Sequence, residues 1–122
     1  MKSRRYTVLV VEDELLIRIG VVEELEEAGF TVLQAATADV AIALLEANPA
    51  IRLLFTDVDM PGSMDGLKLA AAVRNRWPPI RVIVTSGHIH AADVTAANDQ
   101  RFFAKPYDMV AVAAAFHEML AA

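Results

Sequence analysis

Short continuous runs of apolar residues alternate along the chain with longer segments in which apolar and polar positions recur at helical spacing. A short apolar run is typical of a strand that is buried on both faces of a sheet. Five such runs are present: Tyr6 to Val11, Thr31 to Ala35, Ile51 to Thr56, Ile80 to Thr85 and Arg101 to Ala104. The segments that follow them are predicted to be helices, over residues 14–28, 37–47, 67–77, 88–98 and 108–120.

Residues that commonly begin and end helices stand at the expected places. In the first predicted helix the apolar side chains share one face, and a run of glutamates is expected to face water. The apolar positions are Ile17, Val21, Leu25 and Ala28. Gly29 follows as an end signal, and Thr37 is placed to cap the second helix. Residues 60–66 have the Pro and Gly content of a loop.

Regular alternation of strands and helices implies a parallel sheet with helices on both faces, which is the doubly wound α/β class. The 122 residues suit one domain, and we expect it to cover residues 1–122 with a core from about 6 to 121. In open sheets of this class, ligands bind at the carboxyl ends of the strands. The residues at those ends are therefore the candidates for chemistry.

Composition narrows the classes of protein that the chain can represent. It is 56% hydrophobic with a mean hydropathy of +0.39, which suits a buried core and excludes intrinsic disorder. It has no cysteine, so disulfides, thiolate metal sites and a cysteine nucleophile are excluded. A net charge of -5 argues against direct nucleic-acid binding. The apolar run Val8 to Val11 is too short for a signal peptide or a membrane span, so we expect a cytoplasmic chain without membrane contact.

Four carboxylates, one hydroxyl and one ammonium group follow the predicted strands. They belong to Glu12, Asp13, Asp57, Asp59, Ser86 and Lys105. Crowded carboxylates repel one another unless a positive charge compensates them. A site of oxygen ligands without Cys or His suits a hard cation, and we expect Mg²⁺ or Mn²⁺. Lys105 can supply a further positive charge.

These groups are the parts needed to accept a phosphoryl group, with Asp57 as the candidate nucleophile that forms an acyl phosphate. Each residue alone also has an ordinary structural interpretation. Asp13 is a possible helix cap, Asp59 a loop residue, Ser86 a turn residue and Lys105 a solvated charge. Because four strand ends carry the required chemistry together, the joint interpretation is favoured.

Five stretches resemble the motifs of response regulator receiver domains, and the resemblance covers essentially the whole chain. They are Val8 to Glu14, Asp57 to Pro61, Asp65-Gly66, Val84 to Gly87 and Lys105-Pro106. The resemblance implies a CheY-like (flavodoxin-like) sheet of five parallel strands in the order 2-1-3-4-5. It implies a receiver in a two-component phosphorelay that takes a phosphoryl group from a sensor histidine kinase or a histidine phosphotransfer protein. Such a chain is no enzyme in the usual sense, because it catalyses only its own Mg²⁺-dependent phosphorylation and dephosphorylation.

The resemblance also implies a role for each site residue. Asp57 looks like the phosphorylated residue, and Asp13, Asp57 and the backbone carbonyl of Asp59 would bind the metal, with Glu12 acting through a metal-bound water. Ser86 takes the place of the switch hydroxyl, and Lys105 matches the lysine that pairs with the phosphoryl group. The Lys105-Pro106 bond would be cis, and Phe102 falls at the aromatic switch position. Asp59 and His88 stand where the family tunes dephosphorylation.

The output surface implied by the resemblance comprises the helix from about His88, the fifth strand and the last helix. We expect Phe103 and Tyr107 to be packed rather than exposed there. Three features depart from the family pattern: one extra residue between Pro61 and Gly66, the absence of Gly-Ala before the fifth strand, and a short connection over 88–101. The downstream protein partner stays open, as does the choice between a monomer and a phosphorylation-linked dimer.

Other interpretations of the same residues are a phosphatase, a receiver that only binds, and a flavin-binding module. Asp57-Val58-Asp59 resembles the paired aspartates of haloacid dehalogenase-like phosphatases, but that pair belongs after the first strand and the chain is short for that family. Intact Asp13, Asp57, Ser86 and Lys105 argue against a receiver that only binds. A flavin site needs a hydroxyl-rich loop where this chain has Glu12-Asp13. The chain is either a stand-alone regulator or a piece of a larger protein.

Overall fold

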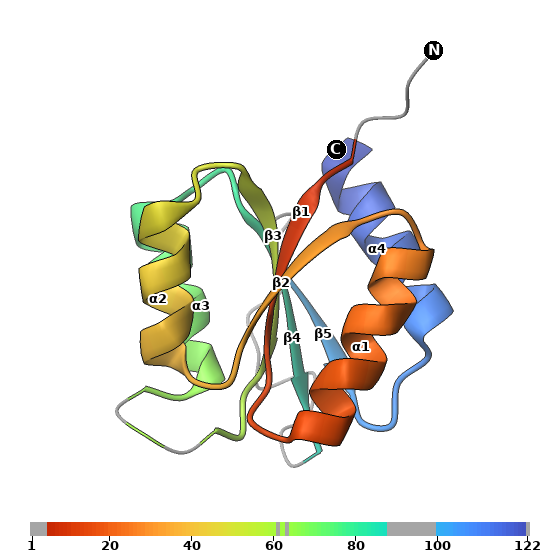
Figure 1. Ribbon diagram of the computed structural model, residues 1–122, viewed down its shortest axis with the longest axis horizontal. Coiled ribbons are helices and arrows are strands. Elements are labelled where there is room, and N and C mark those ends of the chain that lie inside the picture. Colours follow the sequence, from red (N-terminus) through yellow and green to blue (C-terminus); the bar gives the residue numbers. More distant parts are fainter. Residues whose placement is uncertain (1–4, 61, 63, 88–99, 122) are drawn as a thin grey trace.

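The computed structural model describes residues 5–60, 62, 64–87 and 100–121. In chain order the elements are β1 (Thr7–Val11), α1 (Leu15–Glu27), β2 (Thr31–Ala35), α2 (Ala38–Ala47), β3 (Ile51–Asp57), α3 (Gly66–Arg76), β4 (Arg81–Ser86), β5 (Gln100–Ala104) and α4 (Met109–Ala121). All strands are parallel, in the order β2-β1-β3-β4-β5 (Figure 1). The fold class and the strand order expected from the sequence are therefore confirmed.

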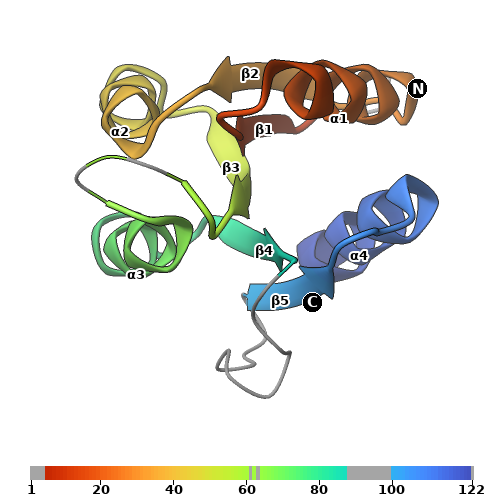
Figure 2. The ribbon, with the colours of Figure 1, turned by 90° about the horizontal axis from the view of Figure 1, so that it is seen from below.

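Helices cover both faces of the sheet. Figures 1 and 2 show α2 and α3 on one face and α1 and α4 on the other. Leu54 of β3 faces α2 and α3, whereas its neighbours Leu53 and Phe55 face α1 and α4, because successive side chains of a strand point to opposite faces. Burial on both faces explains why the strands read as continuous apolar runs rather than as alternating ones.

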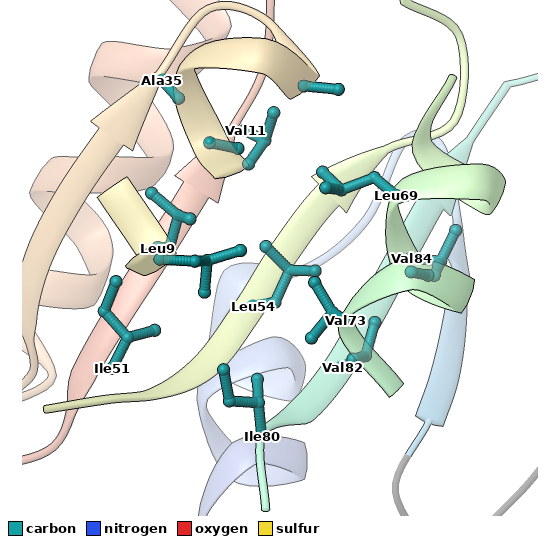
Figure 3. Close-up of a cluster of buried hydrophobic side chains, with 14 of the residues drawn as sticks. Leu9, Val11, Ala35, Ile51, Leu54, Leu69, Val73, Ile80, Val82 and Val84 are labelled. Atoms are coloured by element: carbon teal, nitrogen blue, oxygen red, sulfur yellow. The ribbon is translucent and has the colours of Figure 1, made fainter. Parts of the chain in front are cut away.

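The core on the α2/α3 face is built mainly from branched aliphatic side chains (Figure 3). Leu9, Leu54 and Val84 supply it from the sheet, and Leu69 and Val73 from α3. Burying such a side chain contributes about 1.5–3 kcal/mol relative to leaving it exposed. The second core lies on the other face and includes the two fully buried rings of Phe55 and Phe116.

The helix signals predicted at Thr37 and Gly29 act as expected, and Asp65 supplies a further cap that the sequence pattern did not predict. The Thr37 side chain accepts a hydrogen bond from the Val40 N–H at 3.2 Å, and the Asp65 carboxylate caps α3 by accepting from the Lys68 N–H at 2.9 Å. Gly29 has a φ of 101°, a conformation that favours glycine after a helix. One detail was wrong: Ala28 is exposed, because α1 ends at Glu27 and Ala28 is the residue that caps it.

Some predicted bounds move by one residue. The Ile80 N–H bonds to the Trp77 carbonyl in a turn, so β4 begins at Arg81, and it extends to Ser86, which pairs with Ala104. Gln100 pairs with Val82, so β5 begins one residue earlier than the apolar run. The helix predicted over 88–98 lies outside the described residues. Within the described part of the chain, no helix has both the length and the apolar character that crossing a membrane requires.

Candidate functional site

The polar residues predicted at the strand ends meet at the carboxyl edge of the sheet, the edge seen in Figure 2. Glu12 and Asp13 follow β1, and Asp57 is the last residue of β3. Each of these three residues offers a carboxylate oxygen, and the three oxygens lie within 4.8 Å of one another. Glu12 and Asp57 are buried, whereas Asp13 is exposed. The cluster is therefore open to solvent on the side of Asp13.

Lys105, directly after β5, places a positive charge beside the negative charges of this cluster. Its Nζ donates a hydrogen bond to Asp57 Oδ2 at 3.0 Å and lies 3.6 Å from Glu12 Oε1. Burial by itself lowers the pKa of Lys105, but the hydrogen bond to Asp57 and the charges of Asp57 and Glu12 more than offset it and raise that pKa. Lys105 thus stays protonated and holds one oxygen of Asp57.

Glu12 is a buried acid of the cluster whose pKa is clearly raised. Its burial, together with the charge of Asp57, raises the pKa of Glu12 to about 7, against the opposing effects of the Glu14 N–H and of Lys105. Arg18, which the sequence analysis did not select, donates from its guanidinium to the backbone carbonyl of Glu12 at 2.8 Å. This hydrogen bond from α1 holds the backbone of Glu12 in place at the end of β1.

We expect the raised pKa of Glu12 to make the free energy of unfolding depend on pH when EDTA removes divalent cations. Between about 4.5 and about 7 the folded chain holds the Glu12 proton and the unfolded chain releases it, so this carboxyl destabilises the fold increasingly as pH rises. Glu12→Gln should therefore gain in free energy of unfolding relative to wild type across that range, as measured by urea unfolding. Glu23→Gln, at an exposed position, serves as the control. A difference that stays constant with pH would contradict the raised pKa.

Gly66, which the sequence analysis noted only as a loop residue and part of a motif, is required by the site. Its N–H donates to the Val58 carbonyl at 3.1 Å, which brings the start of α3 against the end of β3. A Cβ at Gly66 would overlap the carbonyl oxygen of Asp57 and lie 2.7 Å from its carbonyl carbon. Only glycine fits this approach, so Gly66 helps to set the backbone position of Asp57.

Hydrogen bonds link the ends of β3, β4 and β5. The Ser86 hydroxyl donates to Asp59 Oδ2 at 2.9 Å, and the Asp59 N–H donates to Asp57 Oδ1 at 3.2 Å. The Lys105 N–H donates to the Ser86 carbonyl at 3.0 Å. The structure therefore brings Asp57, Asp59, Ser86 and Lys105 into one connected group.

The aromatic residues after β4 occupy different faces of the sheet. Phe102 is partly buried against the α2/α3 core, whereas Phe103 packs on the opposite core. Tyr107 packs edge-on against Phe55, with ring centroids 5.6 Å apart, so the expectation that Phe103 and Tyr107 are packed is confirmed. The Lys105-Pro106 bond is cis, also as expected. His88 lies outside the described residues.

The donor set fits a hard divalent cation. The cluster of Glu12, Asp13 and Asp57 offers carboxylate oxygens, and such ligands suit Mg²⁺ or Mn²⁺. A cation would also relieve the repulsion among the three carboxylates. The acidic cluster is therefore able to hold a metal ion.

The family model of the response regulator receiver domain matches residues 8–117. The chain belongs to this family. The receiver is a domain of two-component systems and not a catalytic enzyme in the usual sense. The match agrees with the position of Asp57 at the end of β3, and it favours the receiver over the phosphatase interpretation, which requires paired aspartates after the first strand.

Similar proteins include both regulators and kinases. The receiver is 37% identical over 120 residues to the sensor kinase CckA of Brucella abortus (strain 2308), and 35% identical over 111 residues to the hydrogenase transcriptional regulatory protein HoxA of Cupriavidus necator. These alignments cover 93% and 88% of this chain but only 12% and 22% of the two relatives. A response regulator receiver protein from Sinorhizobium medicae superposes with a TM-score of 0.88 at 25% identity, covering 98% of this chain and 97% of that one.

Proposed function

We propose that Asp57 accepts a phosphoryl group from a histidine of a sensor kinase or a histidine phosphotransfer protein. The observation that supports this most strongly is the position of its carboxylate. Asp57 is 3% exposed, carries the Lys105 ammonium on one oxygen and lies beside two further acidic groups. A buried carboxylate so close to other acids has a role in binding positive charge or in chemistry.

Apart from the donor histidine and a divalent cation, the transfer uses only groups at the carboxyl edge of the sheet. A carboxylate oxygen of Asp57 forms a bond to phosphorus while the P–N bond to the donor histidine breaks, and the electron pair of that bond returns to the imidazole. Mg²⁺ or Mn²⁺ would neutralise charge on the phosphoryl oxygens. Lys105 adds a second positive charge from the β5 side, and the Asp59 N–H holds the other Asp57 oxygen in place.

The remaining roles follow from this assignment. Asp13, Asp57 and the carbonyl of Asp59 would hold the metal, and Glu12 would contribute through a water. The hydroxyl of Ser86 and the ring of Phe102 respond to the phosphoryl group, and Asp59 and His88 tune its hydrolysis. The receiver thereby catalyses only its own phosphorylation and dephosphorylation.

The surface around the site suits the docking of a phosphodonor protein. The proposed location of the receiver is the cytoplasm, because the kinase needs ATP. Three apolar side chains at the beginning of α1 are solvent-exposed: Leu15 (56%), Leu16 (84%) and Ile19 (41%). They lie two to six residues beyond Asp13 along the chain, so an apolar surface lies near the acidic site. Exposed apolar groups beside a reactive site favour protein docking over a small-molecule substrate. The downstream protein would instead contact β5 and α4, and the segment from His88 that the resemblance adds to this surface lies outside the described residues.

The decisive experiment is intact-protein mass spectrometry after incubation with acetyl phosphate and Mg²⁺. We expect wild type to gain the mass of one phosphoryl group and Asp57→Asn to gain none. Asp39→Asn, which changes an exposed aspartate in the first turn of α2, controls for loss of a carboxylate and should gain as wild type does. Equal labelling of wild type and Asp57→Asn, or no labelling of wild type, would overturn the proposal.

A further inference from the structure

The Ser86 hydroxyl has a partner before any phosphoryl group arrives. It donates to Asp59 Oδ2 at 2.9 Å, and Ser86 itself is 1% exposed whereas Asp59 is exposed. In the proposed function the same hydroxyl is the group that turns to a phosphoryl oxygen on Asp57. One hydroxyl therefore serves two acceptors, the Asp59 carboxylate before phosphorylation and the phosphoryl oxygen after it.

The backbone holds Asp59 where it can make this contact. The Asp59 N–H donates to Asp57 Oδ1, and the preceding Val58 N–H donates to the Thr85 carbonyl at 2.8 Å. Ser86 is held in turn through its carbonyl by the Lys105 N–H at 3.0 Å. The Asp59–Ser86 bond thus connects the ends of β3 and β4. Because Ser86 is also bonded to Lys105, a movement of Ser86 would displace the end of β5.

Elementary chemistry makes the two acceptors exclusive. A serine hydroxyl has one proton to donate, so it cannot donate fully to both. On Asp57 the phosphoryl group carries roughly 1.5–2 negative charges at neutral pH in place of the single charge of the carboxylate, and these charges repel the Asp59 carboxylate and attract the hydroxyl proton. Ser86 must leave Asp59 when it bonds to the phosphoryl group.

We propose that Asp59 is a latch that retains Ser86 in the unphosphorylated position. Asp59 is thus a positioning residue for Ser86. The strength of the bond between its carboxylate and Ser86 sets how strongly the unphosphorylated position of Ser86 is favoured over the phosphoryl-bound one. This inference rests on the proposed phosphorylation of Asp57 and adds to it a role for the Asp59 side chain, separate from its carbonyl and from the tuning of hydrolysis.

The first test measures the latch without any phosphoryl group. A double-mutant cycle of Asp59→Ala and Ser86→Ala, by urea unfolding in EDTA, should show that the two residues stabilise the fold jointly. We expect the double variant to differ from the product of the two single effects by roughly tenfold in the unfolding equilibrium constant, the size typical of a hydrogen bond to a charged group. Additive effects of the two substitutions would overturn the latch, whatever happens at Asp57.

The second test measures the switch with beryllium trifluoride, an anion that mimics a phosphoryl group on a carboxylate. At saturating Mg²⁺, Asp59→Ala should bind it about tenfold more tightly than wild type, because the competing acceptor is gone. The Lys105 amide, which bonds to the Ser86 carbonyl, is the NMR signal to follow. Unchanged affinity would reduce the Asp59–Ser86 contact to a structural bond and overturn its role in switching.

A control separates the latch from the simple removal of a negative charge. In the Ser86→Ala background, adding Asp59→Ala should change beryllium trifluoride affinity little, since no hydroxyl remains to be held. An equal tightening in both backgrounds would assign the effect to charge alone and overturn the latch. If wild type binds neither beryllium trifluoride nor a phosphoryl group, the proposed function is overturned, and the role of Asp59 in switching is overturned with it. The double-mutant cycle in EDTA would still decide whether the Asp59–Ser86 bond stabilises the unphosphorylated fold.

Discussion

Replacing Gly66 by alanine is expected to destabilise the receiver by about 2–4 kcal/mol and to abolish most of its phosphorylation by acetyl phosphate. The new Cβ would lie 2.7 Å from the Asp57 carbonyl carbon and 2.8 Å from Val58 Cα, and both are backbone atoms that cannot rotate away. Either α3 moves outward or the end of β3 is displaced. Both changes break the Gly66–Val58 hydrogen bond and move the Asp57 carboxylate relative to Lys105.

The expected direction is opposite to the intrinsic preference of the helix. Gly66 is the first residue of α3, and alanine ordinarily stabilises a helix relative to glycine. Gly20 offers a matched control inside α1, because a Cβ there meets nothing within 4 Å. Gly20→Ala should stabilise the protein by about 0.5–1 kcal/mol and leave labelling unchanged. Urea unfolding and the labelling rate test both variants, and a Gly66→Ala protein as stable and active as Gly20→Ala would refute the steric argument.

The sequence predicted those parts of the site that depend on local pattern. The continuous apolar run of β3 identified a buried parallel strand, and Asp57 is its last residue. Since carboxyl ends of parallel strands share one edge, the rule for ligand sites also predicted that Glu12, Asp57 and Lys105 would come together. The contacts of Lys105 with Glu12 and Asp57 in the structure agree with that prediction.

The pattern of apolar and polar residues could not predict contacts between segments that are distant in sequence. The need for glycine at position 66 arises from the backbone of Asp57 and Val58, which the sequence does not place near α3. The bond from Ser86 to Asp59 depends on the conformation of the loop after β3, and a lone aspartate there reads as a turn residue. Such residues carry no periodic signal, so only the three-dimensional arrangement reveals what they contact.

Lys105→Met is expected to lower the free energy of unfolding in EDTA by about 2–3 kcal/mol and to slow labelling of Asp57 strongly. The substitution keeps the aliphatic length but leaves two carboxylates, 4% and 2% exposed, without the ammonium between them. Removing one partner of a buried ion pair typically costs about 3–5 kcal/mol, and the 25% exposure of the Lys105 side chain reduces that figure. Lys68→Met, at an exposed position of α3, should change stability by less than about 0.5 kcal/mol.

A double-mutant cycle with Asp57→Asn attributes this effect to charge. Once Asp57 is neutral, the ammonium compensates fewer negative charges, so Lys105→Met should cost about 1–2 kcal/mol less in that background. Mg²⁺ should restore part of the stability of Lys105→Met, because the cation replaces the lost positive charge beside Glu12 and Asp57. If the cost is the same in both backgrounds and Mg²⁺ restores nothing, Lys105 stabilises the fold by packing alone. The acidic cluster would then need another source of compensation, and the assignment of Lys105 to the phosphoryl group would lose its electrostatic basis.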